Sequence, residues 1–181
     1  MTSMVGRAVG MLAVVSGLSG LFVLVLQIGQ RAQDTREQYW ALALFNLLLI
    51  PAATYLWRSL GPSALLTVAT ACGVGSLILW AYHLILNPVG SLESLWLWTA
   101  AIWWLVLGTA LRHVGRRIGV FTFVVGLAAL LDAIVSTPAL NPPFLVFALL
   151  GLWKIPLSFA WALVIGVWMI RSPVTLRTKV A

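Results

Sequence analysis

The chain has 181 residues, of which 62% are hydrophobic and only 8% are charged, whereas about a quarter of the residues of an ordinary soluble domain are charged. This composition excludes a water-soluble fold, because a chain of this length cannot bury so much apolar surface in its own core. The net charge is +7, but Lys and Arg stand in short segments between apolar runs and not in clusters that could follow nucleic-acid phosphates. We therefore predict no nucleic-acid partner and expect the partner to be the lipid bilayer.

Six apolar segments follow one another along the chain, and each is close to the length of about 20 residues that crosses a bilayer as a helix. They cover residues 5–28, 39–60, 62–86, 94–111, 118–136 and 143–170. The segments between them are short and contain the Gly, Pro and charged residues that end helices. We predict a single all-α domain over residues 1–181, an integral membrane bundle of six transmembrane helices in which sequence neighbours pack antiparallel.

The distribution of Lys and Arg predicts the orientation of this bundle. Basic residues are enriched in cytoplasmic segments of membrane proteins. If both termini are cytoplasmic, the inner segments hold Arg7, Arg58, Arg112, Arg116, Arg117, Arg171, Arg177 and Lys179, and the outer loops hold only Arg31 and Arg36. We therefore predict cytoplasmic N- and C-termini, because the opposite orientation would invert the bias.

Asp132 and Lys154 are charged residues that lie well inside apolar segments, away from the segment ends. An unpaired charge at such a position costs at least about 2.5–3.5 kcal/mol. The two residues lie at similar depths in neighbouring segments, and the lysine side chain tilts toward the N-terminal end of its helix and so toward Asp132. Two interpretations stay open: an interhelical ion pair that serves packing, or a polar site for an ion, a proton or an anionic ligand.

Small and polar residues recur at helical spacing in several segments, which predicts the faces that helices turn toward each other. The clearest examples are Gly6, Gly10, Ala13, Gly17 and Gly20; Cys72, Ser76, Trp80, His83 and Asn87; Thr122, Gly126, Ala129, Asp132 and Ser136; and Gly151, Lys154 and Ser158. The alternative is that the last three groups line a cavity open to the outside. Its candidate residues are then Asp132, Lys154, His83, Trp103 and Ser158, with Trp96 and Trp103 as a wall.

The sequence offers no constellation for catalysis or for a cofactor. The single cysteine, Cys72, excludes an internal disulfide and a thiolate metal cluster, and no phosphate-binding loop or zinc motif is present. Residues 17–20 resemble the Gly-x-Ser-Gly motif of the rhomboid intramembrane proteases, but no histidine stands where it could activate Ser19. We predict a protein that is not an enzyme and that holds no cofactor and no metal.

Two stretches, residues 103–131 and 163–171, resemble uncharacterised bacterial six-span families, notably domain of unknown function 4386. In that family a segment ending in Gly-x-x-Leu-Arg, here Gly108 to Arg112, leads through a basic turn into another Gly-rich segment. The resemblance implies a six-span protein of the bacterial cytoplasmic membrane and carries no catalytic residues. In size the chain is also similar to the substrate-binding components of energy-coupling-factor vitamin transporters, although it lacks their long outer loop.

The function predicted from these features is that of a non-enzymatic accessory or structural membrane subunit, which packs against another membrane protein or a second copy of itself. The alternative is a component that binds or transports a small solute in an outward-facing polar pocket.

Overall fold

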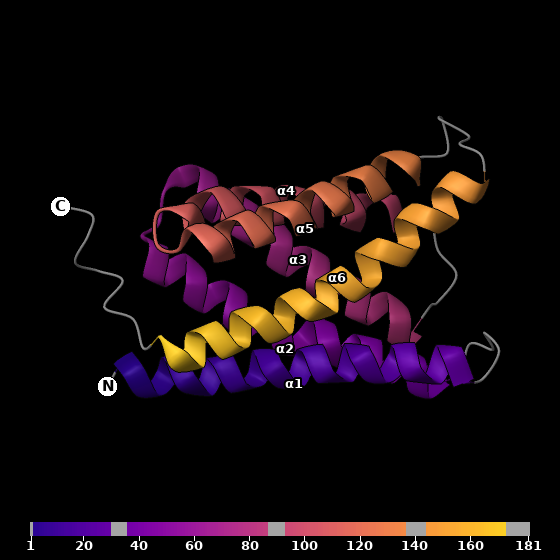
Figure 1. Ribbon diagram of the computed structural model, residues 1–181, viewed down its shortest axis with the longest axis horizontal. Helices are drawn as coiled ribbons and strands as arrows, with labels where there is room; N and C mark the ends of the chain where they lie inside the picture. The colour runs from indigo at the N-terminus through magenta and orange to yellow at the C-terminus, as the bar shows by residue number, and fades with distance from the viewer. Residues whose placement is uncertain (1, 30–35, 87–92, 137–143, 173–181) are drawn as a thin grey trace.

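The computed structural model describes residues 2–29, 36–86, 93–136 and 144–172, and within them all side chains except those of residues 2–3, 27–29, 93–95 and 144–154. This part of the chain is all-helical, as predicted, and contains no strand (Figure 1). Its helices are α1 (Thr2–Gly29), α2 (Arg36–Leu60), α3 (Ala64–Leu86), α4 (Glu93–Arg112), α5 (Arg116–Val135) and α6 (Phe144–Arg171). Each coincides with one apolar segment, and the ends differ by at most three residues, as at α1, which begins at residue 2 and not 5.

Four of these helices are long and apolar enough to cross a membrane, so the chain has the elements of a membrane protein. Within the described residues the spanning candidates are Met4–Leu26, Arg36–Leu60, Ala64–Leu86 and Arg116–Val135. In α6 the apolar stretch with described side chains, Ile155–Arg171, is shorter. The described side chains of α4 include four tryptophans, Trp96, Trp98, Trp103 and Trp104.

The helices form a closed ring. Each packs against its neighbours in the sequence, and α6 packs extensively against α1, so that the first and last helices complete the circle. Figure 1 shows α1 along one edge of the bundle and α4 and α5 together on the other, with α6 crossing obliquely from the end of α5 to the start of α1. One hydrophobic core, which includes Leu49, Trp104 and Ile165, runs through the ring.

Glycines allow two of the helix pairs to approach closely. A Cβ atom on Gly10 of α1 would lie 2.7 Å from the carbonyl oxygen of Gly166 of α6, and one on Gly166 would lie 2.6 Å from that of Gly10. The same holds between α4 and α5, where a Cβ on Gly108 would lie 2.6 Å from the backbone nitrogen of Phe123. The predicted small-residue face of α1 is therefore confirmed as a helix contact, because all five of its residues are buried.

Hydroxyl groups join α1 to α2. Ser16 donates a hydrogen bond to the carbonyl of Phe45 at 2.7 Å, and Ser19 Oγ lies 3.1 Å from the carbonyls of both Ser16 and Ala41. The Gly-x-Ser-Gly serine thus makes its contacts with backbone carbonyls of the bundle. A helix contact accounts for this motif without any catalytic role for Ser19.

The turn between α2 and α3 is built as its sequence predicts. Gly61 has a φ of +85°, the left-handed conformation that ends helices. Ser63 then accepts a hydrogen bond from the backbone N–H of Leu66 at 3.2 Å, which caps α3. This tight connection fixes α2 and α3 as antiparallel neighbours.

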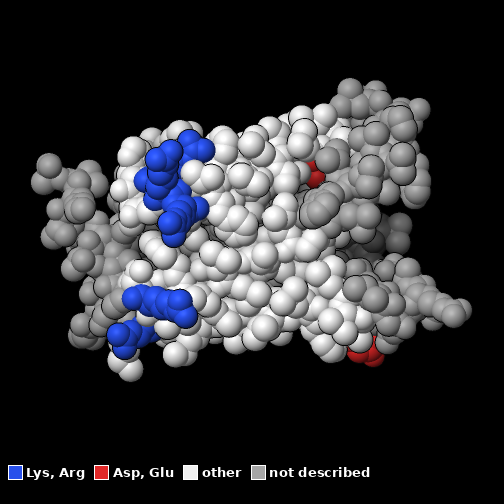
Figure 2. Space-filling model, viewed as in Figure 1, with Lys and Arg blue, Asp and Glu red and all other residues white. Residues whose placement is uncertain are grey.

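Arginines gather at one end of the bundle, as Figure 2 shows for the face in view. Within the described residues this arginine belt is formed by Arg7, Arg58, Arg112, Arg116, Arg117 and Arg171, all exposed. We call this end of the ring the arginine end. Helices α2 and α4 begin at the opposite end, with Arg36, Glu37 and Glu93.

Candidate functional site

A central cavity of about 260 Å³ lies inside the ring, and all six helices contribute to its lining. The lining residues lie between the end opposite the arginines and about the middle of the bundle, from Trp96 near the start of α4 to Leu49 midway along α2. The cavity therefore occupies only one half of the ring.

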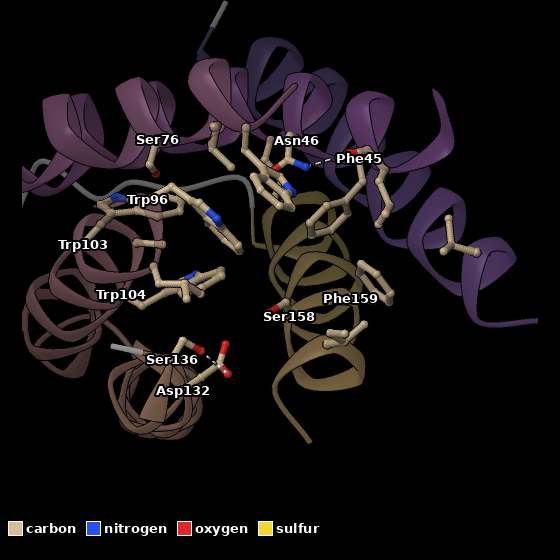
Figure 3. Close-up of a pocket in the computed structure, with 18 residues that line it drawn as sticks. Phe45, Asn46, Ser76, Trp96, Trp103, Trp104, Asp132, Ser136, Ser158 and Phe159 are labelled. Atoms are coloured by element: carbon tan, nitrogen blue, oxygen red, sulfur yellow. Dashed lines mark hydrogen bonds between the residues drawn. The ribbon is translucent and has the colours of Figure 1, made fainter. Parts of the chain in front are cut away.

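Polar groups face this cavity from three directions. Asp132 of α5 is only 6% exposed and lines the cavity together with Ser136, whose hydroxyl lies 3.5 Å from Asp132 Oδ1, at the outer limit of a hydrogen bond. Figure 3 shows the Asp132 carboxylate pointing into the space between α5 and α6, with Ser158 on the facing side. Across the cavity on α2, the Asn46 side-chain amide donates to the carbonyl of Leu42 at 2.7 Å. A buried carboxylate, two hydroxyls and an amide thus line the same cavity.

Stacked aromatic rings form one wall. The ring centroids of Trp80 of α3 and Trp96 of α4 lie 4.3 Å apart, with an angle of 24° between the planes. Both rings line the cavity. His83 stacks on Trp80 at 5.2 Å, so the imidazole supports the wall from outside the lining.

A second group of indoles closes the cavity toward the arginine end. Trp103 and Trp104 of α4 line the cavity, and each contacts Trp161 of α6 edge to face, with centroids 5.7 and 5.8 Å apart. We call these three residues the aromatic floor. The indole N–H of Trp161 donates to the hydroxyl oxygen of Thr122 at 2.9 Å, which ties the floor to α5. Beyond the floor the core is filled by residues such as Leu107, Leu111 and Met169.

The structure brings together part of the predicted site. Asp132, Trp103 and Ser158 line the cavity, as does Trp96 of the predicted wall. His83 is buried but is separated from the lining by Trp80. Lys154 lies in α6, and its side chain falls outside the described residues, as does Asn87. The predicted ion pair between Asp132 and Lys154 stays a prediction.

One residue of the predicted faces is wrongly placed. Cys72 is exposed on α3. The neighbouring Gly73 is buried instead, because the Trp103 ring of α4 packs directly onto it and leaves no space for a Cβ atom. Gly73 is therefore the residue of α3 that faces the bundle here, and the adjacent Cys72 faces outward. The face of α5 was predicted correctly, since Thr122, Gly126, Ala129 and Asp132 are buried.

The sequence did not predict the lining residues Asn46 and Trp104, or Trp161, which packs against Trp104. Asn46 is a polar residue inside an apolar segment, and the same contrast that singled out Asp132 could have found it. Trp104 and Trp161 gave no such signal, because tryptophan in an apolar helix is also typical of the lipid interface. No protein-family model, no curated protein sequence and no solved structure matches this chain.

Proposed function

We propose that the protein binds a small solute in the central cavity, as a binding or transport component of a membrane. The observation that carries this proposal is the buried Asp132 carboxylate at the edge of a cavity lined by all six helices. Ionisable groups inside a bundle mark solute and ion pathways more often than other positions do. Ligand sites commonly combine an apolar, aromatic lining with a few polar groups that fix orientation, and this cavity has both.

We further propose that all six helices cross the membrane, with both termini in the cytoplasm. Support comes from the arginine belt, since basic residues are retained on the cytoplasmic side. The cavity then lies in the outer half of the membrane, and the aromatic floor separates it from the cytoplasm. The resemblance to domain of unknown function 4386 supports the bacterial cytoplasmic membrane as the location, and it stays a prediction.

The solute that fits such a cavity is small, with a flat or apolar part. Trp80 and Trp96 offer stacked ring faces, and the carboxylate and hydroxyls of α5 and α6 offer hydrogen bonds. An aromatic wall adds about 0.5–1.5 kcal/mol per ring contact beyond the burial of area. Recognition thus depends on the shape of the solute and on one or two polar groups.

Native mass spectrometry of protein purified in a mild detergent tests the proposal. We expect a small adduct on the wild-type protein that is lost in Asp132→Asn and in Trp96→Leu. The control is Thr109→Val, because Thr109 is exposed on α4 and its hydroxyl bonds only to its own helix, at 2.7 Å from the Val106 carbonyl. An adduct that persists in both cavity variants would contradict binding at this site.

The same spectra test the accessory-subunit function. A mass higher by that of another protein would identify a partner, and a multiple of the chain mass would identify a homo-oligomer.

A further inference from the structure

A second hollow lies at the arginine end, between the start of α5 and the last turns of α6, with a volume of about 460 Å³. We call it the basic groove. Two exposed arginines, Arg116 and Arg117, lie on its α5 side. Its apolar walls include Phe121 of α5 and Val164 and Trp168 of α6.

The α5 side of the basic groove has the features of an anion site. Gly115 precedes the helix in an extended conformation, with φ −155° and ψ 107°, and no side chain caps the helix start. The first backbone N–H groups of a helix have no acceptor within the helix, and the positive end of its dipole lies there. Two guanidinium groups stand at the same place, and guanidinium binds phosphate oxygens in pairs.

No carboxylate of the described residues lies beside these charges. In the described part of the chain the acidic residues are Glu37 and Glu93, which begin α2 and α4 at the opposite end, and Asp132, near the other end of α5. On the face in view in Figure 2, the arginine belt forms separate blue patches with no described acidic residue beside them. An anionic partner from outside the chain complements it.

The apolar walls distinguish a lipid from a free phosphate ion. Val164 is 43% exposed and lies one turn before Trp168, deeper along α6 from the arginine end. Phe121 faces the groove from α5 at a similar distance from that end. An ion held by Arg116 and Arg117 would leave these side chains uncovered, whereas an acyl chain would bury them. Tryptophan near the helix end is also typical of the headgroup boundary.

We propose that the basic groove binds an anionic phospholipid. The lipid phosphate contacts Arg116, Arg117 and the N–H groups at the start of α5, and an acyl chain lies against Phe121, Val164 and Trp168. This site is separate from the central cavity, and it does not depend on the solute-binding function.

The test uses the full chain in nanodiscs of phosphatidylcholine mixed with phosphatidylglycerol, followed by native mass spectrometry of retained lipid. We expect selective retention of phosphatidylglycerol and about a tenfold or greater fall in Arg116→Gln/Arg117→Gln, because each basic residue contributes about 1 kcal/mol to binding of anionic lipid. The matched control, Arg7→Gln/Arg58→Gln, removes the same charge from the same belt outside the groove. An equal fall in both variants would mean diffuse attraction and would overturn the proposal.

Two further arms keep the proposal testable if the double variant does not fold. Val164→Trp places a larger side chain in the space proposed for the acyl chain and leaves the charge unchanged. We expect this variant to retain several-fold less phosphatidylglycerol. Soluble glycerol phosphate, added as a competitor, should leave retention unchanged. Displacement by glycerol phosphate, or unchanged retention in Val164→Trp, would show that the groove does not bind a lipid chain.

Discussion

Trp161 and Thr122 are joined by a hydrogen bond of 2.9 Å between two side chains that are both fully buried. The Thr122 hydroxyl accepts from the indole N–H and in turn donates to the carbonyl of Ile118 at 2.8 Å. The bond therefore fixes the aromatic floor to the backbone of α5, and the position of Trp161 sets where the central cavity ends.

Thr122→Val is expected to destabilise the folded protein by about 1–3 kcal/mol, because it leaves the buried indole N–H of Trp161 without an acceptor. Unfolding in mixed micelles of increasing SDS content measures the change. Thr109→Val is the control, since the same substitution on an exposed face removes only a bond within one turn of helix. Equal losses of unfolding free energy in the two variants would show that the hydrogen bond between Trp161 and Thr122 does not stabilise the bundle.

Gly166→Ala is expected to destabilise the bundle by about 1–3 kcal/mol, since the added methyl group would collide with the backbone of α1 at Gly10. Gly75→Ala is the matched control, because a Cβ atom there meets nothing within 4 Å. This control should be neutral or more stable by up to about 1 kcal/mol, since alanine favours helix more than glycine does. The measurement is the thermal unfolding of both variants and of the wild-type protein. A Gly166→Ala variant as stable as the wild-type protein would contradict the close contact of α1 with α6.

Cysteine labelling tests the side from which the cavity opens. In a Cys72→Ala background, we expect Ser158→Cys to react with a membrane-impermeant thiol reagent added outside intact cells, because Ser158 lines the cavity. Ala162→Cys, one turn nearer the arginine end on α6 and fully buried, should not react. Reaction of Ser158→Cys only in inverted vesicles would reverse the proposed orientation.

Asp132→Asn separates the two interpretations of the buried carboxylate. If Asp132 serves solute binding, we expect loss of the bound adduct with a change in unfolding free energy below about 1 kcal/mol. A purely structural ion pair predicts a loss of about 3–5 kcal/mol, because the partner charge would stay buried alone. SDS unfolding and native mass spectrometry on the same preparation provide both values.

The sequence was sufficient for the helices and for some of their contacts. Apolar length and the Gly-Pro-Ser turn at residues 61–63 predicted where helices begin and end, and glycine spacing predicted the buried face of α1. The contact of α1 with α6 could not be predicted, because small residues on one helix do not identify the helix that packs on them. For the same reason the position of Cys72 was wrong, since the Trp103 ring that selects Gly73 comes from another helix.

The candidate site was predictable where polarity contrasted with its surroundings and where Trp96 and Trp103 share one face of a helix. Asp132 and Ser158 stand out in apolar segments, and both line the cavity. The aromatic floor depends on tryptophans of two different helices meeting edge to face, and neither helix shows this by itself. The supporting position of His83 behind Trp80 likewise depends on a ring stack that spacing alone does not specify.

The closure of the ring by α1 and α6 also orders the assembly of the protein. Of the six helices, α6 is synthesised last, so the helix that supplies Ser158 to the cavity and Trp161 to its floor packs against α1, the first of the six. The cavity and its floor therefore cannot be complete before α6 has been synthesised. Because Thr2 and Arg171 begin and end helices at the same end of the ring, a permuted chain with these ends linked and a new break at the α2–α3 turn should rebuild the same bundle.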